Sequence, residues 1–193
     1  MTETTNVANL RCPWSQTRDK LIQNFHDHEW GKINLEDNYL FEMLVLQLFQ
    51  SGLNWRVILH KRENFRKAFY DFDPARVATM NELDVHNLMM DSSIIRNRRK
   101  IESAIQNAKA VLMIQAKYGS FAKFIQSSIP MQIMHNPEIF EDIPASSDVA
   151  KNLAKKMKKE KFTFVGPVIV YSYLQSIGLI NDHLECCPFK YQG

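Results

Sequence analysis

The sequence predicts an all-α fold, and three observations support this prediction. Several segments carry apolar residues three and four positions apart, which is the spacing of one face of a helix. Hydrophobic residues make up 45% of the 193 positions, enough to build a buried core. The β-branched run at residues 168–170 has no evident partner strand. We therefore expect one domain over residues 11–190, after a polar, disordered tail at residues 1–10.

The expected helices of the first half follow from apolar content and capping residues. Residues 39–50 are nearly all apolar but too few to span a membrane, which predicts a buried helix. Residues 54–69 begin at Asn54, a favourable N-cap, and continue with helical apolar spacing, so we expect one helix there. Another is expected over residues 81–88.

In the second half, Gly119 ends a long amphipathic segment, while Pro137 and Pro144 make residues 135–147 the least regular stretch. A Gly-Pro pair at residues 166–167 separates the last two helical segments. The helices expected in this half cover residues 100–118, 120–127, 148–161 and 168–179.

Composition excludes several classes of protein. The aromatic content of 11% excludes wholesale disorder, and no apolar run is long enough for a membrane span. Three cysteines, two of them adjacent, make a poor disulfide framework and fit a reducing cytoplasm. The net charge of +3 permits a nucleic-acid partner without requiring one. We expect a cytoplasmic monomer with no membrane partner.

A lysine-rich helix followed by a tight turn predicts a nucleic-acid contact. Lys155 and Lys159 belong to this helix, and Phe164 and Gly166 lie in the turn before an apolar helix. This order is typical of a helix-hairpin-helix, in which glycine lets the backbone approach a phosphate and the lysines add electrostatic affinity. A solvated lysine face followed by a routine turn is the alternative. A second basic run, residues 95–100, could line the same path or be a solvated helix start.

Cysteines and histidines near both chain ends suggest a metal site. Cys12, His26, His183 and Cys187 offer two thiolates and two imidazoles, the ligands of a closed tetrahedral zinc site. Such a site would tie the two ends of the chain together. Alternatively, Cys12 is a free thiol and the C-terminal histidine and cysteine lie on the surface.

Spaced motifs from Arg11 nearly to the C-terminus resemble the DNA-3-methyladenine glycosylase I family of bacterial repair enzymes. The motifs that carry this resemblance are RCPW (11–14), HDHEWG (26–31), GLNW (52–55), KREN (61–64), IIR (94–96), FVGP (164–167) and NDHL (181–184). The resemblance implies a helix-hairpin-helix glycosylase fold with two helical lobes around a DNA-binding cleft. It also implies that the protein flips 3-methyladenine out of alkylated double-stranded DNA and hydrolyses its N-glycosidic bond.

The resemblance also implies roles for individual residues. Cys12, His26, His183 and Cys187 match the family's zinc ligands, so the expected cofactor is a structural Zn²⁺. Cys187 is preferred to its neighbour because it follows His183 by four residues and precedes a proline.

Trp14 and Trp55 match base-stacking positions and Trp30 the pocket floor, although composition alone would place any of them in the core. Leu53 lies in the turn expected to fill the gap left by the flipped base.

The chain departs from the family at three pocket positions. The family glutamate is Gln47 here, and two family tyrosines are Phe25 and Ile22. An amide keeps hydrogen bonding but loses negative charge, and Gln47 could instead only satisfy hydrogen bonds in the core. Two hypotheses follow: a working monofunctional glycosylase with Gln47 at the catalytic position, or a catalytically weak or inactive relative that binds DNA.

Overall fold

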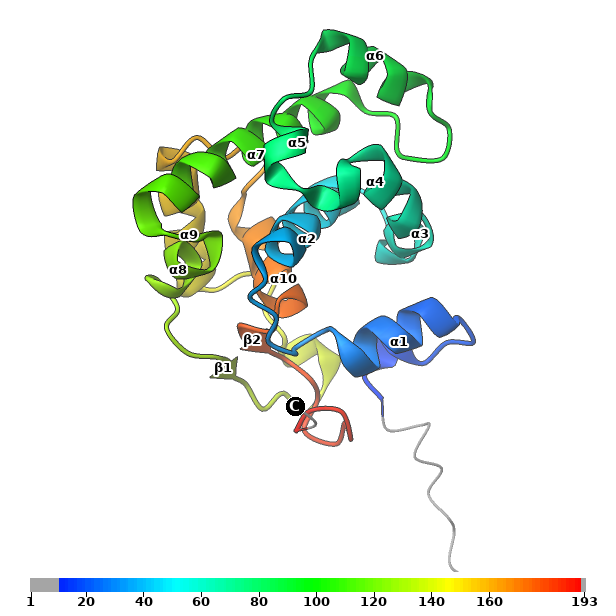
Figure 1. The fold of residues 1–193 in the computed structure, drawn as a ribbon. Helices are drawn as coiled ribbons and strands as arrows, with labels where there is room; N and C mark the ends of the chain where they lie inside the picture. The colour runs from blue at the N-terminus through cyan, green and yellow to red at the C-terminus, as the bar shows by residue number, and fades with distance from the viewer. Residues whose placement is uncertain (1–10, 192–193) are drawn as a thin grey trace, which may run out of the picture.

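The computed structural model describes residues 11–191, so the tail expected at residues 1–10 lies outside the described part. The described chain is mostly helical (Figure 1). At its centre lies α2 (Asp37–Gln50), which is buried from Leu40 to Phe49, as its apolar sequence predicts. Helices α7 (Arg98–Tyr118), α8 (Phe121–Gln126) and α10 (Pro167–Ser176) pack around it.

The segment expected to form one helix over residues 54–69 is instead two helices, α3 (Trp55–His60) and α4 (Arg62–Ala68). Lys61 separates them with φ −100° and ψ 0°, and its ammonium donates a hydrogen bond to the carbonyl of Ser93 at 2.8 Å. This tertiary contact fixes a bend that the apolar spacing does not reveal. Asn54 caps α3 as predicted, because its side chain accepts from the amide of Arg56.

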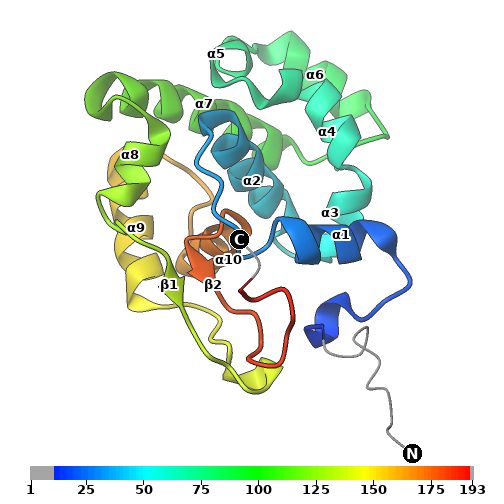
Figure 2. The same cartoon turned by 60° about the horizontal axis from the view of Figure 1, so that its bottom comes forward.

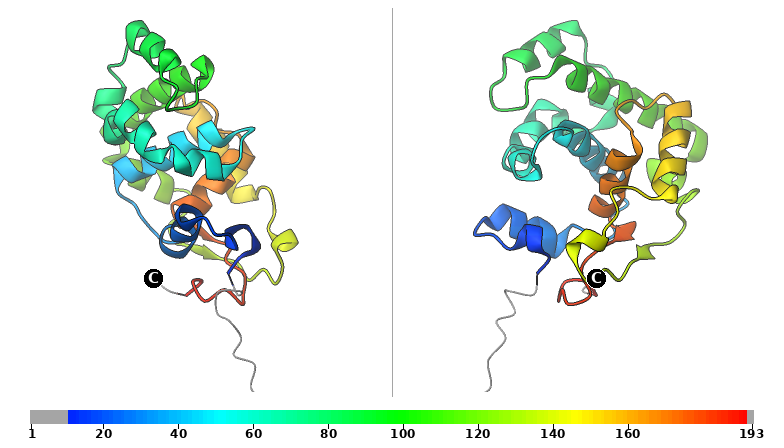
Figure 3. Two further views of the ribbon diagram at one scale, coloured as in Figure 1. Left: turned by 90° about the vertical axis from the view of Figure 1, so that its right-hand side faces the viewer. Right: turned by 180° about the vertical axis from the view of Figure 1, so that it is seen from behind.

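Short helices complete this side of the molecule: α5 (Pro74–Val77) and α6 (Glu82–Met90). On the other side of α2, α9 (Asp148–Lys159) packs against α10 (Figure 3, right). The expected helices over residues 81–88, 100–118, 120–127, 148–161 and 168–179 are confirmed, with ends shifted by up to three residues. In the described residues, no helix has the length and apolar character needed to cross a membrane.

Two features were not expected from the sequence. Helix α1 (Lys20–His28) begins at Asp19, whose carboxylate caps it and also pairs with Arg56 and His60 of α3. The helical class is confirmed, with one addition: β1 (Ile133–Met134) and β2 (Ile180–Asn181) form a two-residue parallel pair. Each strand is too short to leave an alternating pattern in the sequence.

Buried ion pairs join α4 to α2 and to the loop after α1. Arg62 donates to the carboxylates of Glu42 and Glu29, and Arg66 also donates to Glu42. Burial alone raises the pKa of Glu42, but the two guanidinium groups outweigh it, so this pKa lies below its usual value. The network therefore holds charged groups inside the molecule by mutual pairing.

The segment after α1 crosses the end of α10 at very close range. The amide of Gly31 donates to the carbonyl of Gln175 at 2.9 Å, and the amide of Asn34 donates to that of Ile177. At Gly178, φ is +76° and a Cβ would lie 2.0 Å from the carbonyl carbon of Lys32. Only glycine fits this crossing, which places the N-terminal segment against the C-terminal one (Figure 2).

We therefore expect Gly178→Ala to destabilise the protein by about 3 kcal/mol or more, because backbone atoms of Lys32 must move. Gly119→Ala is the matched control: its φ is also positive, at +88°, but its nearest neighbour is the flexible end of Lys123 at 3.5 Å. That variant should lose only about 1–2 kcal/mol. Chemical denaturation measures both, and equal losses would contradict the close-crossing explanation.

Candidate active site

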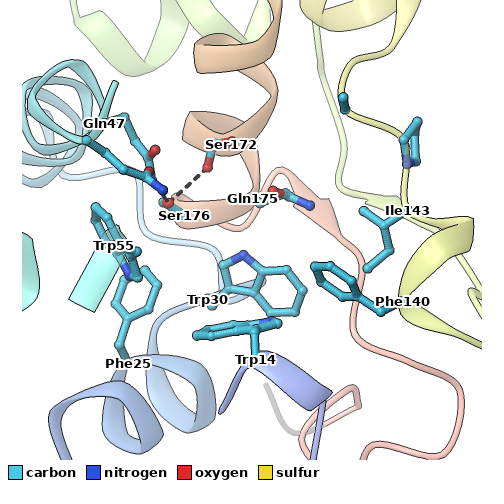
Figure 4. A pocket seen from close by; sticks show the side chains of 13 residues that line it. Trp14, Phe25, Trp30, Gln47, Trp55, Phe140, Ile143, Ser172, Gln175 and Ser176 are labelled. Carbon is cyan, nitrogen blue, oxygen red and sulfur yellow. Dashed lines mark hydrogen bonds between the residues drawn. The ribbon is translucent and has the colours of Figure 1, made fainter. Parts of the chain in front are cut away.

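A cavity of about 430 Å³ opens between α1, α2, α3, α10 and the loop at residues 140–145 (Figure 4). Its size is within the range of small-molecule sites. One wall is aromatic, and the opposite wall carries amides and hydroxyls. The residues that line it are Trp14, Phe25, Trp30, Gln47, Gln50, Trp55, Phe140, Ile143, Pro144, Ala145, Ser172, Gln175 and Ser176.

The aromatic wall consists of four rings from three segments: Trp14 before α1, Phe25 and Trp30 in and just after α1, and Trp55 at the start of α3. The Trp14 and Trp30 centroids lie 5.2 Å apart at 80°, and those of Phe25 and Trp55 lie 5.0 Å apart at 57°. Edge-to-face and tilted packing of this kind holds rings rigidly. All four side chains proposed from the sequence to bind a base therefore line one cavity, whereas Ile22 is buried outside its lining.

Gln47 lies on the polar wall and is only 5% exposed. Its amide nitrogen donates to the Ser176 hydroxyl at 2.8 Å, and that hydroxyl donates to the Ser172 carbonyl at 2.9 Å (Figure 4). The side chain thus forms hydrogen bonds in the core and also borders the cavity. Among the described residues that line the cavity, none is acidic.

Leu53 lies in the turn that follows α2 and is 41% exposed. Its amide donates to the carbonyl of Gln50, while Ser51 (φ −48°, ψ 113°) and Gly52 (φ +78°) give the turn type II geometry. Gly52 is therefore required by its positive φ.

The buried side chain of Lys100 stabilises this turn through two hydrogen bonds. Its ammonium donates to the carbonyls of Phe49 and Ser51 at 2.9 and 2.6 Å, and burial lowers its pKa. It therefore does not line an exposed nucleic-acid path, as one interpretation of the basic run allowed. Sequence reasoning missed this role because a lysine that follows basic neighbours looks solvated.

The turn between α9 and α10 is held by Asn107 of α7, another residue that sequence reasoning missed. The Asn107 side chain accepts from the amide of Thr163 at 2.8 Å and donates to its carbonyl at 3.1 Å. Phe164 then adopts a φ of +53°, which is unfavourable for an aromatic residue. At Gly166, which precedes α10, a Cβ would meet nothing within 4 Å. The fold itself therefore does not require glycine at this position.

A second hollow, of about 450 Å³, joins the Leu53 turn to the start of α10. It shares Gln47, Gln50 and Ser172 with the aromatic cavity. Lys155 and Lys159 are exposed one helical turn apart on α9, the helix that precedes this hairpin. The structure thus brings the turn and hairpin predicted from the sequence to the two sides of one opening.

Cys12, His26, His183 and Cys187 form a buried cluster that could hold a metal ion. Their ligand atoms lie within 4.8 Å of one another. Nδ1 of His183 lies 3.6 Å from the Cys12 sulfur and 3.5 Å from the Cys187 sulfur, and Nε2 of His26 lies 3.7 Å from the Cys187 sulfur. Tetrahedral geometry with metal–sulfur and metal–nitrogen bonds near 2.3 and 2.0–2.1 Å requires sulfur–nitrogen distances of about 3.5 Å. The cluster fits such an ion.

The other nitrogen of each histidine already has a partner. Nε2 of His183 donates to the carbonyl of Trp30 at 2.9 Å, and Nδ1 of His26 lies 2.8 Å from Asp27, which Arg11 pairs in turn. Partners of this kind orient metal-binding imidazoles. They leave one nitrogen of each ring facing the two sulfurs, and they tie the cluster directly to Trp30 of the cavity.

The two thiols are electrostatically unlike. A hydrogen bond from Cys12 lowers the pKa of Cys187, and the same contact, together with burial, raises the pKa of Cys12. The contact between the two sulfurs therefore shifts their pKa values in opposite directions, whereas a bound metal ion would favour the thiolate form of both. Cys186 is exposed and lies outside the cluster.

The chain is similar to known glycosylases over nearly its whole length. The family model for methyladenine glycosylase matches residues 14–191. The DNA-3-methyladenine glycosylase of Haemophilus influenzae is 39% identical over 93% of this chain and 97% of its own length. DNA-3-methyladenine glycosylase 1 of Escherichia coli is 41% identical over 93% and 96%.

Solved structures agree. A crystal structure of 3-methyladenine DNA glycosylase I superposes with a TM-score of 0.89 at 41% identity, covering 92% of this chain and 98% of the other. The Staphylococcus aureus enzyme, whose structure describes recognition of 3-methyladenine, gives 0.89 at 38% identity, with 92% and 95% covered.

We expect protein purified without chelator to carry one equivalent of a divalent metal. Cys12→Ala and Cys187→Ala should each lose it and lower the melting temperature, because a buried ligand is missing. Cys186→Ala is the matched control, since this neighbouring thiol is exposed, and it should retain full metal content. Metal analysis by mass spectrometry measures all three. Metal retained by Cys187→Ala and lost by Cys186→Ala would contradict this ligand set.

Proposed function

This chain belongs to the methyladenine glycosylase family, and on that premise we propose that it is a monofunctional DNA repair glycosylase. It hydrolyses the N-glycosidic bond of 3-methyladenine in alkylated double-stranded DNA. The observation that carries the proposal is the aromatic cavity, which opens beside the Leu53 turn and the α9–α10 hairpin. A flipped base can enter such a cavity while the duplex stays outside.

We further propose that α9, its turn and α10 act as a helix-hairpin-helix, and that the cavity lies in a DNA-binding cleft between two helical lobes. Gly166 supports this assignment, because the open space above it leaves room for a phosphate at the start of α10. Lys155, Lys159 and Phe164 add charge and contact area beside it. Leu53 fills the gap in the base stack when the nucleotide has left it.

The four rings capture the flipped base. A base methylated at N3 in DNA is flat and positively charged, so the faces of Trp14 and Trp55 can stack on it, with Trp30 beneath and Phe25 alongside. Cation–π attraction in a desolvated site contributes about 2 kcal/mol per good contact. This attraction favours the alkylated base over a neutral adenine.

Gln47 stands at the catalytic position with a neutral amide. It can accept a hydrogen bond from the base but supplies no negative charge to the sugar as the bond breaks. Because N3 methylation already weakens the glycosidic bond, cleavage proceeds without that charge. Preorganised charge commonly contributes 10²–10³ to a rate, so we expect a slower enzyme than one with a carboxylate here.

The metal of the buried cluster is, in this proposal, a structural Zn²⁺ bound by Cys12, His26, His183 and Cys187. Two thiolates and two imidazoles form a closed zinc site with no open position for substrate. When bound, the ion contributes folding free energy. The residues around it hold the chain ends together and orient Trp30 through the His183 hydrogen bond.

The alternative of an inactive DNA-binding relative is not favoured. Full-length similarity is to glycosylases, and the cavity remains open despite Gln47 and Phe25. Aromatic rings that line a cavity suit a flipped base, whereas a duplex bound on the outside of the protein would not reach them.

We expect the wild-type protein to release 3-methyladenine from methylated duplex DNA, and Gln47→Glu to release it at least tenfold faster at saturating DNA, because it adds negative charge beside the reacting sugar. In this variant the Ser176 hydroxyl must turn from the Ser172 carbonyl toward the new carboxylate. Gln106→Glu controls for added charge outside the cavity. Chromatography of released base measures the rate, and no release from either Gln47 form would overturn the proposal.

The hairpin lysines yield a separate expectation. Replacing both Lys155 and Lys159 with Gln should weaken DNA binding and lower the slope of log affinity against log salt by about 2, one phosphate contact each. Release at saturating DNA should stay near the wild-type rate. Lys67→Gln with Lys109→Gln removes the same charge from exposed sites on α4 and α7. Anisotropy titrations measure the slope, and equal changes in both double variants would mean that the hairpin has no special contact.

A further inference from the structure

Gln175 borders the cavity from α10 and has no part in the mechanism above. It is 9% exposed and lies in Figure 4 between Ser176 and Ile143, with its oxygen on the Ser176 side. Its amide nitrogen donates to Oδ2 of Asp182 at 2.6 Å. A carboxylate can only accept, so this contact decides which end of the amide faces Asp182 and which end is left for the cavity.

Asp182 is itself firmly held and only 1% exposed. The Tyr171 hydroxyl donates to its Oδ2 at 2.7 Å, and Nδ1 of His135 lies 2.6 Å from its Oδ1. With donors on both oxygens, the buried carboxylate cannot turn away from Gln175. Asp182, the motif residue before His183, is thus hydrogen-bonded to Gln175 in the wall of the cavity.

Gln47, which lies with Gln175 in the polar wall, is also oriented by a partner that can only accept. The Ser176 hydroxyl gives its proton to the Ser172 carbonyl, so it can only accept from Gln47, and the Gln47 amide nitrogen faces it. Within residues 11–191, no donor reaches the side-chain oxygen of Gln47 or of Gln175. The cavity therefore presents two carbonyl acceptors with fixed orientation.

Resting on the proposed function, we infer that Gln175 is a second specificity-determining residue, oriented by Asp182, whose oxygen accepts a hydrogen bond from the exocyclic amino group of the flipped purine. The Gln47 oxygen provides the other acceptor of the pair. An amino group at C6 matches two acceptors, whereas a keto oxygen at C6 would face them with its lone pairs. The two acceptors therefore favour a 6-aminopurine over a 6-oxopurine. Selectivity comes from paired dipoles in place of a carboxylate.

The test removes the hydrogen-bond donor from the base in one arm and the acceptor from Gln175 in the other. The probes are the free bases 3-methyladenine and 3-methylpurine, which lacks the amino group at C6. All three tryptophans line the cavity, so their fluorescence reports its occupancy. Gln175→Met keeps the length of the side chain but has no acceptor. Its preference for 3-methyladenine over 3-methylpurine should fall about tenfold, with 3-methylpurine binding unchanged.

The control Gln106→Met removes an amide that lies outside the cavity and donates to the main-chain carbonyl of Lys161. It should keep the wild-type preference. Equal weakening of both bases by Gln175→Met would mean that Gln175 only packs, and an unchanged preference would mean that it does not contact the amino group. Either result overturns the inference.

Asp182→Asn tests the orienting contact while Gln175 stays in place. An asparagine can present its own nitrogen, which frees the Gln175 amide to turn, so the preference should again fall. Metal content confirms that the neighbouring His183 is undisturbed. A wild-type preference in this variant would overturn the role of Asp182. Excision by the wild type with no effect of either variant refutes only this inference, whereas a wild type that neither binds nor excises refutes the proposed function.

Discussion

The buried cluster of Cys12, His26, His183 and Cys187 is the constraint on which the site depends. It joins a segment before α1 to the segment after β2, and these lie at opposite ends of the sequence. The same cluster holds Trp30 of the cavity, because His183 donates to its main-chain carbonyl and the two rings meet edge to face with centroids 4.6 Å apart. The ring of Trp14 also lies 5.2 Å from that of His26. Loss of one of these four side chains would therefore displace the aromatic wall as well as the two terminal segments of the described chain.

The two walls of the cavity are held by different physics. The aromatic wall is fixed by packing of rings from three segments, whereas each glutamine of the polar wall is fixed by a hydrogen-bond partner that can only accept. Ser176 and Asp182 play this part for Gln47 and Gln175. Because neither glutamine carries a charge, burying its side chain costs far less free energy than burying a carboxylate would. In our proposal, the fixed orientation of the two amides selects the amino group of the base. Gln47 thus serves as a hydrogen-bond acceptor in a cavity whose described lining residues include no acid.

The Leu53 turn and the α9–α10 hairpin, which we propose face DNA, are also held by buried side chains. Lys100 donates to the carbonyls around the Leu53 turn, and Asn107 clamps the backbone of Thr163 in the hairpin. Both come from α7, so a single long helix positions the turn and the hairpin relative to each other. These contacts hold the backbone on which Leu53 and Gly166, the residues that we propose meet DNA, are placed.

The sequence by itself determined the helical class and most helix positions, and its motifs, through their resemblance to a known family, indicated the cysteine–histidine cluster and the aromatic residues that line the cavity. Apolar spacing, capping residues and rare residue types are local signals, and they survive without knowledge of the fold. Tertiary structure alone decided the break at Lys61, the β1–β2 pair, the inward role of Lys100, and the orientation of Gln47 and Gln175. Each of these depends on a partner distant in sequence, such as Ser93 for Lys61 or Ser176 for Gln47. A hydrogen bond between distant residues leaves no periodicity in the chain, so only the folded structure can reveal it.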